Sequence, residues 1–212
     1  HGANLLLNKD PKYSFKLASE LNQYNMQRQM LEKDLLKKIL SETKNCSDDP
    51  VLIMSGKNWH EGVIGIVAAR LKDKFNKPVI LISIDGNIGK ASARSIVGFD
   101  IGSVIISATQ ENILIKGGGH KMAGGFSVKI ENINIFKNFI FKKFKGVNGN
   151  LKNEKPLLLD SIIAPSAVNL EFYNKVELLS PCGSGNPEPK FIIENVKTIN
   201  GKIVGEKHVK SI

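Results

Sequence analysis

The feature that most constrains this fold is the stretch GGGHKMAGG at residues 117–125, in which five of nine residues are glycine. Glycine leaves the backbone N–H groups unshielded and permits backbone angles that other residues resist, so such a stretch can wrap closely around an anion. His120 lies in its middle, Lys121 adds a positive charge, and a helix following it would add the positive end of its dipole. A glycine-rich turn that only lets two elements pack is the alternative.

Net charge is the one unusual feature of the composition. Thirty Lys and Arg against twenty Asp and Glu give a formal charge of +10. Such an excess favours a polyanionic partner, which is bound through phosphate contacts and counterion release. A lysine-rich solvated surface without a nucleic-acid partner is the alternative.

Several classes of protein are excluded by the sequence. It contains no apolar run of about 18 residues, which would span a membrane, and it has no secretory signal pattern. Cys46 and Cys182 stand alone, which argues against a zinc site and a disulfide framework. We therefore expect a cytoplasmic protein without a membrane partner. Because the chain begins with His1 and stops within an alternating pattern, we also expect it to be part of a larger protein.

The first 49 residues are predicted to form a connector helix region. Asp10 and Pro11 are suited to the start of a helix over 10–45, and apolar residues then recur at spacings of three, four and seven. This stripe consists of Leu17, Leu21, Tyr24, Leu31 and Leu35. A coiled coil is the alternative to a connector between domains. Residues 46–50 are predicted to end the helix with a turn.

Residues 50–145 are predicted to form an α/β domain. The strands are expected at 51–54, 78–84, 89–95 and 125–130, and the helices at 62–75, 101–115 and 133–144. Because strands and helices alternate, we expect a sheet covered by helices.

The pattern changes after a linker at residues 146–154. Residues 155–212 are predicted to be the start of an OB-like β-barrel, with strands at 157–163, 191–199 and 202–212, a helical region at 166–179 and the loop SPCGSGNPEPKF at 180–191. Three strands cannot close a five-stranded barrel, so this domain is expected to be truncated.

Three groups of residues carry the predicted chemistry. Trp59 and His60 follow a strand, where the indole could stack on a sugar or base and the imidazole could contact a phosphate; a tryptophan that caps the core is the alternative. Alternation places Ser92 and Arg94 on one strand face, where both can bind one phosphate, and a surface salt bridge of Arg94 is the alternative. With the glycine stretch, the candidate nucleic-acid-binding residues are Trp59, His60, Ser92, Arg94, Ser95, Gly117, Gly118, Gly119, His120, Lys121, Gly124 and Gly125.

Together, WHEGVIGIVAARL, SARS and GGGHKMAGGF resemble the DHH-associated domain of the DHH phosphoesterase superfamily. Combined with SPCGSGNPEPKF after a linker, they are similar to the RecJ family of single-strand-specific exonucleases. The resemblance covers nearly the whole chain, including the connector helix.

This resemblance implies a 5′→3′ exonuclease that acts on single-stranded DNA in recombination and repair. The family uses two divalent metals, manganese or magnesium, whose ligands lie in a DHH domain. This sequence has no DHH triplet, so we expect no metal ligand and no catalytic residue here, and no cleavage by this chain alone. The resemblance implies that the residues named above hold phosphates, with His120 as a candidate stabiliser of phosphoryl charge. The candidate protein partners are a helicase and a single-strand-binding protein.

Two other functions stay open from the sequence. One is a DHH-family phosphodiesterase acting on short oligonucleotides or cyclic dinucleotides, which would not need the C-terminal segment. The other is a non-catalytic nucleic-acid-binding module, in which replacing His120 would matter no more than replacing a surface lysine.

Overall fold

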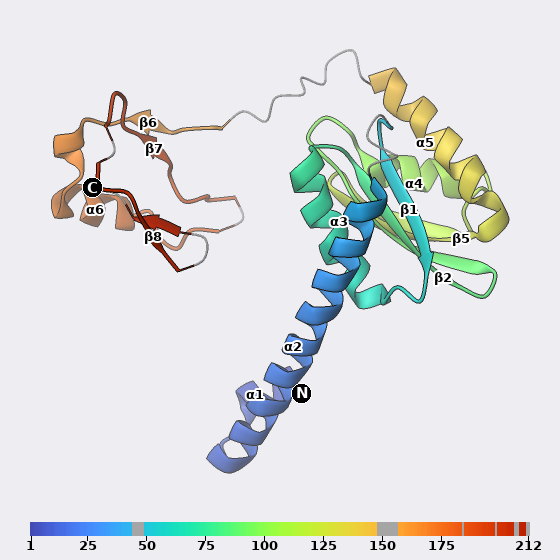
Figure 1. Ribbon diagram of the computed structural model, residues 1–212, viewed down its shortest axis with the longest axis horizontal. Coiled ribbons are helices and arrows are strands. Elements are labelled where there is room, and N and C mark those ends of the chain that lie inside the picture. Colours follow the sequence, from blue (N-terminus) through green and yellow to red (C-terminus); the bar gives the residue numbers. More distant parts are fainter. Residues whose placement is uncertain (44–48, 148–156, 184, 198, 206–207, 211–212) are drawn as a thin grey trace. The chain divides into compact units, whose positions relative to one another are not determined.

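A computed structural model describes all of the chain except residues 44–48, 148–156, 184, 198, 206–207 and 211–212. The chain divides into two compact units, His1–Asn153 and Glu154–Ile212, which we describe separately (Figure 1).

The first unit is a mixed α/β structure, as expected from the alternating pattern. Its helices are α1 (Gly2–Leu7), α2 (Pro11–Glu42), α3 (Glu61–Phe75), α4 (Ile101–Gln110) and α5 (Ile133–Val147), with a short 3₁₀ turn at Ile130–Asn132. Its strands are β1 (Leu52–Lys57), β2 (Val79–Asp85), β3 (Ile88–Arg94), β4 (Lys116–His120) and β5 (Ala123–Lys129).

The five strands form one sheet in the order β1-β2-β3-β5-β4. β1 and β2 run parallel, and every other neighbouring pair is antiparallel. The prediction of a glycine loop at 117–125 is wrong, because these residues form a β-hairpin with a two-residue turn at Lys121 and Met122. Glycine has little strand propensity of its own, so pairing with β3 through β5 imposes the strand here.

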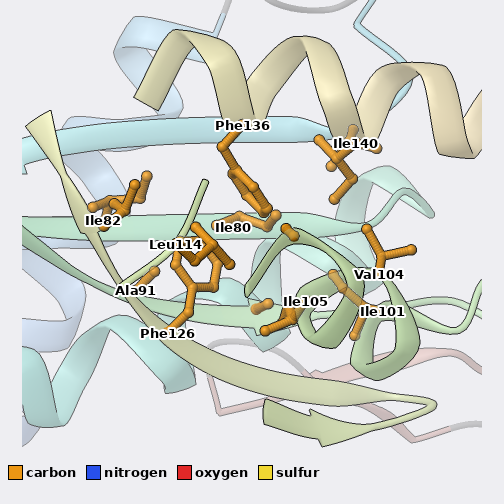
Figure 2. Packing of buried hydrophobic residues seen from close by; sticks show 14 of the residues in the cluster. Ile80, Ile82, Ala91, Ile101, Val104, Ile105, Leu114, Phe126, Phe136 and Ile140 are labelled. Carbon is orange, nitrogen blue, oxygen red and sulfur yellow. The ribbon is translucent and has the colours of Figure 1, made fainter. Parts of the chain in front are cut away.

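Helices cover both faces of the sheet. On one face, α4 and α5 enclose a core that includes Ile80, Ile105, Phe126 and Phe136 (Figure 2). On the other face, α3 and the end of α2 pack over β1 and β2, with Leu71 and Leu81 fully buried between them. The predicted sheet covered by helices is therefore confirmed.

α4 ends earlier than the spacing of apolar residues suggested. The predicted helix ran to Ile115, but α4 stops at Gln110 because Asn112 takes a left-handed conformation with φ +58°. The backbone N–H groups of Ile113 and Leu114 then both donate to the Ala108 carbonyl. This closing turn leads directly into β4.

The long helix α2 begins as predicted, with the Asp10 carboxylate accepting a hydrogen bond from the Lys12 N–H at 2.9 Å. Its contacts are confined to part of the expected stripe. Leu35 is buried where the last third of α2 packs against α3, whereas Tyr24 and Leu31 are exposed. Leu17 is also buried, near the end of α2 that α1 contacts. The predicted turn at 46–50 lies mostly outside the described residues.

A buried carboxylate fixes α2 to α3. Glu32 is only 2% exposed, and it forms ion pairs with Arg28 one turn earlier at 3.0 Å and with Arg70 of α3 at 2.5 Å. A buried charge is tolerated only when it is paired, so this carboxylate holds the two helices in one register.

The second unit contains short elements: β6 (Ser161–Ile162), a 3₁₀ turn (Pro165–Ala167), α6 (Leu170–Glu177), β7 (Phe191–Ile192), β8 (Lys202–Val204) and β9 (His208–Lys210). β6 pairs with β7, and Phe172 packs edge-on against Phe191 with ring centroids 5.1 Å apart. The single strand predicted at 202–212 is wrong, since β8 and β9 form a hairpin. Asn186 closes the glycine- and proline-rich loop by donating to the carbonyls of Leu179 and Pro181.

Across the residues that the structure describes, we find no helix of the length and apolar character needed to cross a bilayer. α2 is long, but its sequence is rich in charged and polar side chains.

Candidate nucleic-acid interface

The uncovered part of the sheet carries three rows of side chains that point to one face. Each row runs across β3, β5 and β4, and the rows are Lys90–Ser127–Lys116, Ser92–Gly125–Gly118 and Arg94–Ala123–His120. We call these nine residues the basic trough. Its middle row has two glycines, and its outer rows carry three permanent cations and a histidine.

The helices leave the trough open because they pack elsewhere. α3 packs on β2 and β3, on the same face as the trough. α4 packs on β4 and β5 from the opposite face. None of the helices that the structure describes in the first unit packs closely on the trough side of β4 and β5, where the side chains of Lys116 and His120 are exposed.

The floor of the trough is backbone. A Cβ at Gly118 would meet no atom within 4 Å, and one at Gly125 would meet only the Ala91 carbonyl oxygen, at 3.4 Å. These two glycines pair directly across β4 and β5. They lie in a hollow of about 610 Å³ that also reaches Glu61 and Lys90. A ligand can therefore approach the peptide groups here without side chains in the way.

Ser92 and Arg94 form one end of the trough together, as alternation predicted. The Arg94 guanidinium donates to the Ser92 hydroxyl at 3.2 Å and to the Ala93 carbonyl at 2.8 Å. Gly65 of α3 makes room for them, since a Cβ there would lie 2.9 Å from the Ser92 hydroxyl and 3.0 Å from the guanidinium. Gly65 was not among the predicted site residues. A glycine inside the predicted helix at 62–75 was nevertheless a signal that this helix packs closely against a neighbouring element.

Lys90 and Lys116 were also absent from the predicted set, although they form the other outer row. The Lys90 ammonium makes an ion pair with Glu61 at 2.8 Å. The hydrogen bond that Lys90 donates to Glu61, together with the negative charge of Glu61, raises the pKa of Lys90 above its ordinary value. Lys90 is thus a charged group held at the mouth of the hollow.

His120 lies at the end of the third row, next to the hairpin turn. Its Nδ1 accepts a hydrogen bond from the Met122 N–H at 3.3 Å. Because Nδ1 accepts here, the proton of the imidazole lies on Nε2, which can donate to a ligand. The neighbouring Lys121 is exposed at the tip.

Asp100 links the hairpin tip to α4. Its carboxylate caps the helix by accepting from the Ser103 N–H at 3.0 Å. This hydrogen bond, with a smaller contribution from the Lys121 charge, lowers the pKa of Asp100 below its ordinary value. The carboxylate form is therefore the one that stabilises the fold.

We expect Asp100→Asn to remove a pH-dependent part of the stability. Because the pKa of Asp100 is lowered on folding, its contribution is complete above the unfolded pKa of about 4 and is lost as pH falls through the folded pKa. Urea unfolding at pH 6 and at pH 3 should show the native protein losing its advantage over Asp100→Asn at the lower pH. An advantage equal at both pH values would contradict the capping role.

Three residues of the predicted set also have structural roles. Trp59 is only 7% exposed and packs in the core beside Gly56, which is the alternative that the sequence left open. His60 caps α3 by accepting from the Gly62 N–H at 3.1 Å. The Ser95 hydroxyl is 1% exposed and donates to the Phe99 carbonyl at 2.6 Å, so it is turned away from solvent.

The glycines of the hairpin divide between its two faces. Gly118 and Gly125 belong to the trough. Gly117 and Gly124 face Ile105 of α4, where a Cβ would approach that side chain to 2.6 Å and 2.5 Å. Gly119 faces the backbone of β5. Only part of the predicted glycine set can therefore contact a ligand on this face.

The residues present do not fit a metal site. Within the described part of the chain, no three His, Cys, Asp or Glu side chains lie close enough together to hold a metal ion. The acidic groups nearest the trough, such as Glu61, are already paired with cations. We therefore derive no step through a metal bound by these residues.

Comparisons with known proteins identify two domains in this chain. Residues 48–146 match the family model of the DHHA1 domain, and residues 159–212 match that of the RecJ OB domain. The chain is 28% identical over 216 residues to the single-stranded-DNA-specific exonuclease RecJ of Bacillus subtilis, covering 98% of this chain and 27% of that protein. It is 30% identical over 226 residues to RecJ of Escherichia coli, covering 99% and 37%.

A solved structure shows the same fold. The crystal structure of RecJ from Thermus thermophilus in complex with Mn²⁺ superposes with a TM-score of 0.80 at 27% identity, covering 98% of this chain and 30% of that one. The same protein has also been solved in complex with Mg²⁺. The chain spans about a third of the length of these relatives. Since both domain models and the full-length alignments agree, the chain belongs to the RecJ family and carries its DHHA1 and RecJ OB domains.

Proposed function

We propose that the basic trough holds the phosphates of a single DNA strand, as the substrate-binding part of a 5′→3′ single-strand-specific exonuclease that acts in recombination and repair. The observation that carries this proposal is the pairing of two open glycines between two rows of basic side chains. Exposed backbone amides and flanking cations are the groups that bind phosphate in proteins.

The trough suits a strand rather than a single ion. Rows two residues apart along a strand are separated by about 6.6 Å, so the outer rows lie about 13 Å apart. Lys90 and Lys116 are at one end and Arg94 and His120 at the other, and successive phosphates of an extended strand can reach both. Contacts of this kind are not base-specific.

The part of this chain in the reaction is positioning. Arg94, Ser92 and the Gly118 backbone would orient the strand, and Nε2 of His120 would stabilise charge on a phosphoryl oxygen. The divalent metal, which supplies activation of water in phosphodiester hydrolysis, would be held by a DHH domain outside this sequence.

We further propose that the chain divides into a connector region at 1–49, the α/β domain at 50–145 and the OB-like domain from 155 onward. The predicted linker at 146–154 overlaps the end of α5 at Val147 and otherwise lies outside the described residues. The protein would act in the cytoplasm, where bacterial DNA is found, and a helicase and a single-strand-binding protein stay predicted partners. The match of residues 159–212 to the RecJ OB domain argues against the smaller phosphodiesterases considered above.

The proposal is tested by fluorescence anisotropy of this chain with single- and double-stranded oligonucleotides of equal length at two salt concentrations. We expect tighter binding of the single strand, which weakens as salt rises. Arg94→Ala should weaken it about fivefold and reduce the salt slope by about one.

The matched control is Lys33→Ala, which removes a positive charge from an exposed position on α2. Equal effects of Arg94→Ala and Lys33→Ala would overturn the assignment of the trough. Mn²⁺-dependent degradation of the single strand by this chain alone would show that the chain itself holds the metal site, which contradicts the proposal.

A further inference from the structure

A second hollow lies directly beyond the Arg94 row of the trough. It has a volume of about 430 Å³ and is formed by the loop after β3 and the tip of the β4–β5 hairpin. The side chains of Ile96, Val97, Phe99 and Met122 make most of its wall apolar, and Asp100 and Lys121 also line it. We call it the tip hollow.

The loop that presents Val97 is held in one conformation. The Ser95 hydroxyl donates to the Phe99 carbonyl, and Phe99 itself is buried against Phe144 at a centroid distance of 4.9 Å. Gly98 takes φ +93°, a conformation that side chains disfavour. The loop therefore turns sharply between Ser95 and Phe99, which are both buried, and Val97 between them is 83% exposed.

The hairpin tip is joined to this loop by backbone hydrogen bonds. The Ser95 N–H donates to the Met122 carbonyl at 2.9 Å, and the Ile101 N–H donates to the Lys121 carbonyl at 3.3 Å. Both walls of the tip hollow therefore belong to one rigid body. An exposed apolar contact on a rigid support is suited to binding, because little side-chain or loop entropy is lost when a ligand orders it.

The residues of the tip hollow follow directly after two residues of the trough's outer row, Arg94 and His120. Ile96 follows Arg94 by two residues and Met122 follows His120 by two, so each pair of Cα atoms is at most about 7 Å apart. Lys121 lies on the rim. A cationic row next to an apolar hollow matches the two parts of a nucleotide, a charged phosphate and a base with apolar faces.

We propose that the tip hollow holds one nucleobase of the strand whose phosphates lie on the basic trough, with Val97 and Met122 in contact with the base. This inference rests on the proposed function and adds a contact to the base. Apolar side chains that contact or separate bases recur in proteins that bind unstacked nucleic acid. Since most of the wall is apolar, the contact tolerates any base.

The test compares two ligands in anisotropy with the full 212-residue chain: a single-stranded oligonucleotide, and one of equal length whose central residues are abasic. The double variant Val97→Ser with Met122→Ser should weaken binding of the ordinary strand about fivefold and leave binding of the abasic strand unchanged. Ile135→Ser, an exposed apolar residue on α5, is the matched control and should change neither.

The result separates this inference from the proposed function. If the double variant binds both strands as the native chain does, or if the native chain binds both strands equally, the base contact is overturned, while weaker binding of both strands by Arg94→Ala still supports the trough. If Arg94→Ala changes neither affinity, the trough itself is wrong. Thermal unfolding of each variant confirms that the changes are not due to loss of the fold.

Discussion

Gly118→Glu is expected to weaken single-strand binding by this chain about 30-fold or more, which corresponds to about 2 kcal/mol. A Cβ at Gly118 points into open space, so the new side chain would occupy the middle of the basic trough. Its carboxylate would cover the exposed backbone, offset the charge of the neighbouring Lys116, and repel phosphate at short range. Anisotropy with a fluorescent oligonucleotide measures the loss.

Gly118→Gln is the matched control, because it fills the same space without the charge. We expect an intermediate loss of about fivefold, since the backbone is covered but the cations remain. Both variants should melt within about 2 °C of the native chain, because no atom is displaced. Native affinity in Gly118→Glu would mean that the strand does not cross the middle row.

Gly119→Ala is expected to destabilise the first unit by about 3 kcal/mol, although it adds only one methyl group. The new Cβ would lie 2.5 Å from the Gly124 Cα and closer still to the Ala123 carbonyl oxygen. These are backbone atoms of the paired strand and cannot rotate away, so the hairpin must open or shift. Thermal unfolding should show a decrease of about 6–12 °C for a unit of this size.

The neighbouring change Gly118→Ala is the control for this prediction. It adds the same methyl group to the same strand on the open face, and it should leave stability unchanged within about 0.5 kcal/mol. Equal melting temperatures for Gly118→Ala and Gly119→Ala would contradict the prediction, because they would show that both faces of β4 have room for a methyl group.

Much of this arrangement follows from local sequence patterns. Alternation in β3 predicted that Ser92 and Arg94 share a face, and the structure confirms it with a hydrogen bond between them. The α/β domain could be predicted because its helices have clear apolar periodicity. The family resemblance is confirmed by the domain matches.

The rest depends on pairing between distant strands. Lys90 and Lys116 enter the trough only because β5 lies between β3 and β4, and no local pattern reports that order. Glycines have no side chain to show which face they occupy, so Gly118 and Gly119 could not be distinguished from sequence. The burial of Trp59 depends on the missing side chain at Gly56 three residues earlier, which is a tertiary contact.

The ion pairs of Glu32 have a mechanical consequence for the long helix that carries them. α2 has 32 residues and is therefore about 48 Å long, yet its contacts with α3 and the sheet lie in its last third. A straight helix that is held only near one end transmits a motion of its free end to the residues that hold it. The arm from Glu32 to the start of α2 is about 32 Å long, so a tilt of about 5° at Glu32 would displace the far end by about 3 Å. A force on that end would act on α3, whose Gly65 lies against Ser92 and Arg94.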